Sequence, residues 1–281
     1  MDSDVKIKVV VENTAGWRGA LGEHGLAFWV EAGPRRVLFD TGQGYVLLRN
    51  AEHLAVLLDS ADAVVLSHGH YDHTGGLRDA LNAAQSPSVY VHPAAFEPKY
   101  ACIEAGKAYD IGMPDMDEAA VRAQAGELVF TKEPVEVVDG LFVTGEIPRV
   151  TEFEDTGGPF FVDRECRQPD PLVDDQAMFF DTAEGVVVLL GCAHAGVVNT
   201  LRHVRELTGG RPIHAVAGGM HLAAASEDRM TRTIAALREL DVERLGPAHC
   251  TGASATAALW AAFPGGCFPC NAGTMMVFER S

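Results

Sequence analysis

The sequence predicts an α/β fold in which two β-sheets pack face to face and helices cover their outer faces. Short apolar runs rich in Val, Leu and Phe recur along the chain, and segments with helical periodicity separate them. Strands come first and last in each half of the chain, with helices between them, which favours two sheets between helical layers. The chain of 281 residues is also long enough to bury a substantial core.

Strands dominate the first third of the chain. Three apolar runs stand there, and Gly33-Pro34 between the second and the third predicts a hairpin. A helix is expected at about residues 45–58, and a short buried strand then ends at His68. In order, the expected segments are VKIKVVVEN, GLAFWVEAG, RRVLFDTG, the helix at 45–58, the strand AVVLSH, the helix GGLRDALNAA and the strand VYVHP.

Residues from about 94 to 132 are less regular, because two prolines and three glycines interrupt them. A helix is expected near residues 117–125. We interpret this segment as an insertion into one domain that spans residues 1–281, and it could cover the active site. The alternative is a plain surface excursion.

The second half repeats the pattern of hairpins and helices. Asp139-Gly140 suits the left-handed turn of one hairpin, and a second is expected to turn at residues 183–185. One helix is expected at about residues 197–207, and another follows Ser226, whose side chain can cap it. In order, the segments are VEVVDGLFVTGEI, AMFFDTAEGVVVLLGC, the helix at 197–207, HAVAGGMHL, SEDRMTRTIAALREL, ERLGPAH, SATAALWAAF and TMMVFE.

The balance of charge limits the partners that the protein could bind. The net charge is −17, from 22 basic and 39 acidic residues. Proteins bind nucleic acids by neutralising phosphates with Lys and Arg, so this balance argues against a nucleic-acid or anionic-membrane partner. A small anionic substrate is still compatible, since bound cations can dominate the local field.

No targeting or membrane segment is expected. The N-terminal MDSDVKIKVVVEN does not resemble a signal peptide, and no apolar stretch is long enough to span a bilayer. Six scattered cysteines in a chain of this length do not make a disulfide framework. We therefore expect a reduced, cytoplasmic protein, and the sequence does not indicate its oligomeric state. The cysteines are Cys102, Cys166, Cys192, Cys250, Cys267 and Cys270.

The strongest local signal is the segment SHGHYDHTGG, which directly follows a predicted strand. Alternate side chains of an extended segment point the same way, so His68 and His70 can reach one cation together. Asp72 and His73 are adjacent, so they diverge and could serve a second cation nearby. Four potential ligands in six residues are hard to explain by core packing, where such groups need partners. Neutral imidazole and carboxylate suit Zn, Fe, Mn or Ni.

Later parts of the chain must complete the two sites, and two histidines stand in similar places. His194 and His249 each follow a predicted strand, beside small residues and before a helix. Either residue alone is more often structural. Beside the first cluster, we interpret both as metal ligands.

These motifs resemble those of the metallo-β-lactamase superfamily. The segment at 67–77 is similar to its H-x-H-x-D-H motif, and LFDTG at 38–42 resembles its strand-end Asp motif. The resemblance extends over nearly the whole chain, from Asn13 to His249. Within the superfamily, the chain is most similar to the branch named after dihydropterin-ribofuranosylaminobenzene-phosphate synthase. The segments that resemble this branch are EHGL at 23–26, GCAHAGVVNT, GGMHL at 218–222 and AHCTG.

The resemblance implies a four-layer αββα sandwich with two mixed sheets and a dimetal site at one edge of the sheets. It implies that His68 and His70 bind one metal, and that the other metal has three ligands. Asp40 would hold the ligand loop by hydrogen bonds. Two divalent ions are expected, Zn²⁺ first, with Mn²⁺, Fe²⁺ or Ni²⁺ as alternatives. The ligands of the second metal would be Asp72, His73 and His249.

The chain departs from the superfamily pattern at two motifs. The third motif lacks its His, and His194 stands where a bridging Asp is common, which leaves open the metal that His194 serves. Glu146, in the third motif, could be an extra ligand or a proton acceptor, although an ion-paired Glu is more common.

Several other residues have two interpretations each. His221 could touch the substrate at the pocket rim or be structural. His24 could contact the substrate or support a ligand. Lys99 could contact an anionic substrate, or it could be a solvated surface residue. The spacing of Cys267 and Cys270 lacks a zinc-binding or redox context, so we expect reduced thiols there.

These features favour a metal-dependent hydrolase. Two cations can lower the pKa of a shared water, and Asp72 could orient that nucleophile while His221 assists at the substrate. The expected substrate is a phosphodiester or another phosphate-bearing small molecule, which would make the protein a zinc phosphodiesterase. One alternative is a transferase that resembles 7,8-dihydropterin-6-yl-methyl-4-(β-D-ribofuranosyl)aminobenzene 5'-phosphate synthase. The other is an iron-loaded redox or sensor protein.

Overall fold

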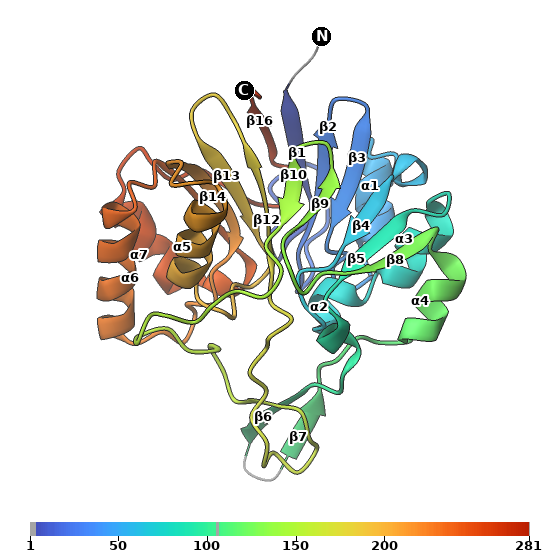
Figure 1. Ribbon diagram of the computed structural model, residues 1–281, viewed down its shortest axis with the longest axis horizontal. Coiled ribbons are helices and arrows are strands. Elements are labelled where there is room, and N and C mark those ends of the chain that lie inside the picture. Colours follow the sequence, from blue (N-terminus) through green and yellow to red (C-terminus); the bar gives the residue numbers. More distant parts are fainter. Residues whose placement is uncertain (1–3, 105–106, 281) are drawn as a thin grey trace.

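The computed structural model describes residues 4–104 and 107–280, and two sheets form its centre (Figure 1). The first sheet has seven strands in the order β16-β1-β2-β3-β4-β5-β8, and the second has six in the order β15-β14-β13-β12-β10-β9. The strands of the first sheet are β1 Val5–Val11, β2 Ala27–Ala32, β3 Arg35–Phe39, β4 Ala63–Val65, β5 Ser88–Val91, β8 Glu127–Phe130 and β16 Met275–Phe278. Those of the second are β9 Val135–Val138, β10 Leu141–Val143, β12 Ala177–Asp181, β13 Val186–Leu190, β14 Ile213–Gly219 and β15 Arg244–Ala248.

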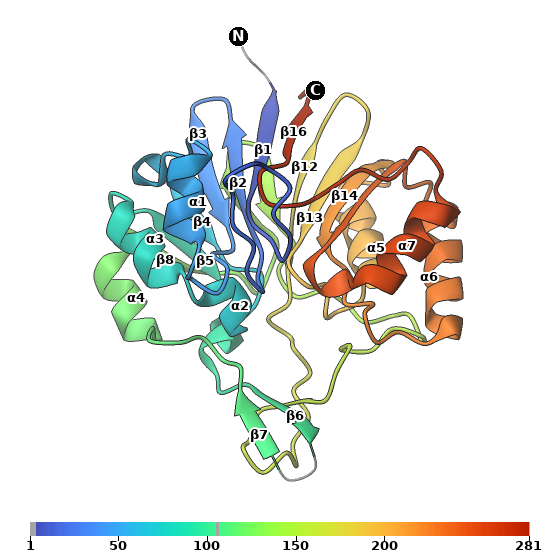
Figure 2. The same ribbon diagram turned by 180° about the vertical axis from the view of Figure 1, so that it is seen from behind.

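Helices cover both outer faces, which gives the four-layer αββα sandwich that the sequence predicts (Figures 1 and 2). Helices α1, α3 and α4 lie against the first sheet, and α5, α6 and α7 lie against the second. Among the helices in the described part of the chain, none combines the length and apolar character needed to cross a membrane. The helices are α1 Leu47–His53, α2 Tyr71–Thr74, α3 Leu77–Ala83, α4 Glu118–Gln124, α5 Val197–Leu207, α6 Glu227–Glu239 and α7 Ala253–Ala262, with short 3₁₀ turns η1 Leu58–Ser60, η2 Pro93–Phe96 and η3 His249–Thr251.

Most predicted elements are present with close boundaries. The β2–β3 hairpin turns at Gly33 and the β9–β10 hairpin at Gly140, both with positive φ, as the turn residues predict. Helix α5 has the predicted bounds, and Ser226 Oγ caps α6 by accepting a hydrogen bond from the Arg229 N–H at 3.2 Å. The helix expected at 45–58 is shorter. Ala55 adopts a left-handed conformation (φ 53°), which ends α1 and turns the chain back.

The segment at 94–132 is only partly an insertion. Helix α4 leads into β8, which pairs in parallel with β5 and extends the first sheet, so residues 118–130 belong to the sandwich. Only the β6–β7 hairpin projects from it. This hairpin forms a separate three-stranded sheet with β11, at the end of the molecule away from the termini (Figure 1). These strands are β6 Tyr100–Glu104, β7 Lys107–Asp110 and β11 Phe160–Phe161.

The expectation that all cysteines are reduced, which rested on the number of cysteines, is wrong for two of them. A disulfide joins Cys102 of β6 to Cys166, 64 residues later, and ties the hairpin to the segment after β11. The count could not reveal this, because the two residues meet only through the fold of the small sheet. Disulfides are uncommon in a reducing cytosol, so cysteine usage no longer supports a cytoplasmic location.

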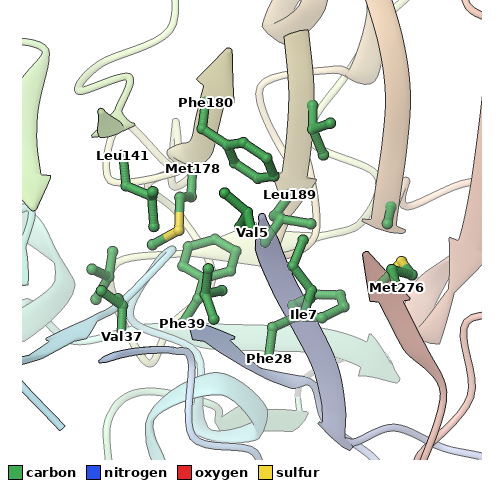
Figure 3. Packing of buried hydrophobic residues seen from close by; sticks show 14 of the residues in the cluster. Val5, Ile7, Phe28, Val37, Phe39, Leu141, Met178, Phe180, Leu189 and Met276 are labelled. Carbon is green, nitrogen blue, oxygen red and sulfur yellow. The ribbon is translucent and has the colours of Figure 1, made fainter. Parts of the chain in front are cut away.

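The core between the sheets consists of aromatic and branched side chains from both sheets (Figure 3). Phe28 of β2 and Phe39 of β3 are fully buried there, with ring centroids 6.3 Å apart. Trp29, on the opposite face of β2, packs under the helices instead. Both faces of β2 are therefore buried, which explains why its sequence is a continuous apolar run rather than an alternating one.

We expect Phe28→Ala to lower the free energy of unfolding by about 3–5 kcal/mol, because it removes a buried ring and leaves a cavity. Urea denaturation measures the change. Phe130→Ala, at a ring 37% exposed on the edge strand β8, is the control and should cost only about 1 kcal/mol. Equal effects of the two substitutions would show that the intersheet core is not the main packing interface.

Candidate metal centre

A cluster of polar side chains lies at one edge of the sandwich, where strands of both sheets end. Strands β3 and β4 are parallel, as are β13, β14 and β15, so the carboxyl ends of each set meet at a common edge. Helix α2, which follows β4, lies at the end from which the small sheet projects (Figure 2). The polar residues that follow these strands are Asp40, His68, Cys192, His194, His221 and His249.

The first ligand group contains His68, His70 and His194, all buried. His68 Nε2 lies 3.0 Å from His70 Nδ1, and the ring centroids of His68 and His194 are 4.8 Å apart. The structure therefore places His194 beside His68 and His70. His70 Nε2 and His194 Nε2 are buried and have no hydrogen-bond partner among the described residues.

The second ligand group contains Asp72, His73 and His249, also buried. His73 Nε2 lies 3.2 Å from His249 Nε2, and His249 Nε2 lies 3.2 Å from Asp72 Oδ2. Asp72 and His73 do not diverge as expected, since the short helix α2 leaves Asp72 Oδ2 and His73 Nε2 only 3.8 Å apart. His24, half exposed, reaches Asp72 Oδ2 at 3.2 Å from the outer side.

Cys192 lies between the two groups, and the sequence analysis did not identify it as a ligand. Its sulfur is within 4.8 Å of the nearest ligand atoms of His68 and His194, and within the same distance of those of His73 and His249. The sulfur lies 3.1 Å from His73 Nε2. The position of Cys192 directly after β13, in line with the other strand-end ligands, is the sequence signal that could have identified it.

Hydrogen bonds orient four of the imidazoles in the same way. His73 Nδ1 donates to Asp40 Oδ2 at 2.7 Å, and His194 Nδ1 donates to the Thr156 carbonyl at 2.8 Å. His68 and His249 make the equivalent bonds to Ser67 Oγ at 2.9 Å and Asn13 Oδ1 at 2.8 Å. With the proton on Nδ1, each ring turns the lone pair of Nε2 toward the centre, as in metal-binding histidines.

The electrostatics favour neutral imidazoles in the first group. Burial lowers the pKa of His70 to about 3. Burial, together with the neighbouring imidazoles, also lowers the pKa values of His68 and His194 well below the usual value. These rings are neutral near pH 7, which is the form that binds a metal.

The second group attracts positive charge. Burial opposes ionisation of Asp72, but the neighbouring imidazoles of His73, His24 and His249 outweigh it and hold the pKa of Asp72 well below its usual value. Burial would likewise lower the pKa of His73, but Asp40 and Asp72 raise it to about 9. A bound cation could therefore take the place of the His73 proton.

The donor set fits divalent metal ions. Each group offers buried imidazole nitrogens that face one another at about hydrogen-bond distance, and lone pairs so arranged repel unless a proton or a cation lies between them. The unpartnered His194 Nε2 would gain a partner from a metal. A mixture of imidazole, carboxylate and thiolate suits Zn²⁺ and other borderline cations.

Residues 174–176 connect the loops that carry the ligands, and the sequence analysis missed them. Asp174 Oδ2 accepts from the Gly69 N–H between His68 and His70, at 2.8 Å. Asp175 Oδ2 accepts from the Ala195 N–H beside His194, at 2.8 Å. Burial raises the pKa of Asp175 to about 7. One short segment therefore positions both loops of the first group.

His221 and the small sheet enclose the first group. The His221 and His194 ring centroids are 4.4 Å apart, and His221 lies with Cys192 and Cys250 in a third set of potential ligands. The ring of Phe160, on β11, lies 5.2 Å from those of both His70 and His194. The small sheet thus contributes an apolar wall to the centre.

Four other residues that the sequence singled out lie outside the two ligand groups. Glu146 pairs with His92 at 3.0 Å and is half exposed, as expected of an ion-paired residue. Lys99 is not solvated, because it is buried between Asp170 and Asp174 at 3.1 and 3.0 Å. Cys267 and Cys270 are free thiols, and neither belongs to a ligand group within the described ranges.

Known proteins resemble the chain over most of its length. A solved structure titled Tm1679, a metal-dependent hydrolase of the beta-lactamase superfamily, is 32% identical, with a TM-score of 0.82 over 97% of this chain and 98% of that one. The 7,8-dihydropterin-6-methyl-4-(beta-D-ribofuranosyl)-aminobenzene-5'-phosphate synthase of Methanocaldococcus jannaschii is 29% identical over 264 residues, 89% of this chain and 88% of that protein.

A more distant structure shares the fold. Zn²⁺-bound PqqB from Methylobacterium extorquens is 14% identical, with a TM-score of 0.56 over 96% of this chain and 99% of that one. Residues 21–249, which include both ligand groups, match the sequence pattern of the Metallo-beta-lactamase superfamily. The chain therefore belongs to the metallo-β-lactamase superfamily.

Proposed function

We propose that the protein is a metal-dependent hydrolase that uses two divalent cations to cleave a small phosphate-bearing substrate. The observation that carries this proposal is the pair of buried ligand groups, His68, His70 and His194 on one side and Asp72, His73 and His249 on the other. Cys192 lies within reach of both groups.

Two bound cations would lower the pKa of a shared water and stabilise charge on the substrate oxygen. The protein's own residues supply the rest of the chemistry. Asp72, ionised and beside His24, can orient the attacking water. His221, whose ring lies beside that of His194, would contact the substrate. Phe160 limits the access of bulk water to the first group.

The substrate is proposed to be a small anion. The net charge of −17 disfavours a polyanionic partner such as a nucleic acid, whereas paired cations can bind a single phosphate. Zn²⁺ is the favoured metal because imidazole, carboxylate and thiol occur together. Turnover of bis(p-nitrophenyl) phosphate by the protein loaded with Zn²⁺ or Mn²⁺ tests the proposal. Bound iron without any turnover would instead support a redox or sensor role.

We expect His70→Ala to lose metal and activity while the fold remains. Turnover should fall by more than roughly 100-fold, the upper end of the cost of losing a residue that only supports a ligand. Metal analysis and circular dichroism accompany the assay. His214→Ala, on β14 and paired with Glu243, is the matched control and should retain both metal and activity. Full activity of His70→Ala would contradict the assignment.

We also propose that Cys192, which lies within reach of both groups, would serve as a shared thiolate ligand of the bound metals. Cobalt substitution tests this, because a sulfur ligand gives Co²⁺ a charge-transfer absorption in the near ultraviolet. We expect Cys192→Ser to remove this band and to weaken binding of both ions. Cys267→Ser, a free thiol outside the ligand groups, is the control and should keep the band. A band of full strength in Cys192→Ser would rule out the shared thiolate.

A second candidate function is transfer rather than hydrolysis, favoured by the 29% identity to the archaeal synthase over most of both chains. Such an enzyme would join a pterin pyrophosphate to a ribofuranosylaminobenzene phosphate by a metal-assisted displacement. Incubation with both substrates and mass analysis of the products separates the two functions. A joined product with no turnover of the phosphodiester would favour the transferase, and the reverse result would favour the hydrolase.

A further inference from the structure

A polar cavity of about 580 Å³ lies beside the metal centre, and none of the chemistry above uses it. The segment at 152–158 forms one wall, and the N-terminal end of α6 forms another. Thr156 and Gly157, which line the cavity, also contact the centre. The Thr156 carbonyl accepts from His194 Nδ1, and a Cβ atom on Gly157 would lie only 2.0 Å from the His221 ring. The cavity and the first ligand group therefore share one wall.

Arg229 is the unusual residue of this cavity. It lines the cavity, yet its side chain is only 7% exposed. Its Nη1 donates to Asp155 Oδ1, whereas Nε and Nη2 have no hydrogen-bond partner among the described residues. Buried donors without acceptors are costly, and a guanidinium presents such donors as a planar fork that matches two oxygens of an oxyanion. The missing partner is thus expected to be a ligand.

The surroundings of Arg229 also favour an anionic ligand. Ser226, Asp228 and Arg229 place the cavity at the N-terminal end of α6, a helix of 13 residues, where the helix dipole favours negative charge. Arg232 adds a second guanidinium, which lies 4.5 Å over the Phe153 ring.

Three acidic residues line the cavity, Glu152, Asp155 and Asp228, and all three are exposed, so water screens their charges. Asp155 and Asp228 also each lie beside an arginine, Asp155 beside Arg229 and Asp228 beside Arg232. In the pair of Arg229 and Asp155, the arginine is buried and the aspartate is exposed.

We infer that this cavity is a binding subsite for a phosphate monoester group of the substrate, remote from the bond that is cleaved at the metal centre. The buried fork of Arg229 and the N-terminal end of α6 would bind the phosphate oxygens. The inference rests on the proposed function, since it assigns a second anchoring point to the same substrate. The subsite itself needs no metal, which allows the two proposals to be tested apart.

The test is calorimetric titration with inorganic phosphate, using the full-length protein with its metals and the same protein after chelation. Circular dichroism checks the fold of the chelated protein. We expect one phosphate-binding site to survive chelation, and Arg229→Gln to weaken it roughly 10- to 100-fold, the loss expected for hydrogen bonds to a charged group. Arg238→Gln removes the same charge from the same helix, at a residue that donates to the Ala262 carbonyl, and should leave binding unchanged.

Arg229→Lys keeps the test decisive if Arg229→Gln does not fold. The variant retains the charge but not the planar fork, so most of the phosphate affinity should still be lost. Phosphate binding that disappears on chelation and is unaffected at Arg229 would overturn the subsite, because the metals alone would explain it. Equal losses in Arg229→Gln and Arg238→Gln would overturn it as well. Failure of the proposed hydrolysis would appear instead as absent phosphodiester turnover, with phosphate binding intact.

Discussion

The buried carboxylate of Asp40 is the interaction on which the arrangement of the metal centre depends. It accepts hydrogen bonds from the Ser67 N–H, the Ser67 hydroxyl and His73 Nδ1, each at 2.7 Å. Ser67 in turn accepts from His68, so one carboxylate orients an imidazole in each ligand group. A buried charge without such partners would be strongly destabilising. The loop geometry that satisfies Asp40 is therefore also the geometry that turns both Nε2 atoms toward the centre.

The backbone of Asp40 supports this interpretation. Its φ of 60° is left-handed, which costs a non-glycine residue about 1–3 kcal/mol and persists only where surrounding contacts enforce it. Close packing of the two sheets also leaves no room for a side chain at Gly191. A Cβ atom there would lie 2.0 Å from Ser67 Oγ. Gly191 precedes Cys192, so the close approach that brings the thiol to the centre requires a residue without a side chain.

Features that depend on residues close together in the sequence could be predicted, whereas contacts between distant residues could not. Periodicity and turn residues predicted the strands, the helices and the αββα layers, because those signals are local. The motif at 68–73 was recognisable because four potential ligands stand within six residues.

The interactions that the sequence did not reveal are long-range. Cys192 meets His73 across 119 residues, and Cys102 meets Cys166 across 64. Cys192 does stand after a predicted strand, but a lone cysteine has no periodic signal, so the residues that it meets are known only once the sheets are packed. The pairing of β8 with β5 is also a long-range contact. It makes residues 118–130 part of the sandwich rather than of an insertion.

Metal binding at the centre would also be coupled to the packing of the two sheets. His68 and Asp72 follow strand β4 of the first sheet, whereas His194 and His249 follow strands of the second. A cation bound by residues from both would link the sheets at their common edge and stabilise the folded state by its binding free energy. The electrostatic field at this edge would then be more positive than the net charge of the protein suggests. A protein of net charge −17 can attract an anion only where cations are concentrated, and with metal bound this edge would be such a place. Arg229 lies beside it as a buried positive charge, so anchoring of a second phosphate there would follow from the same local field.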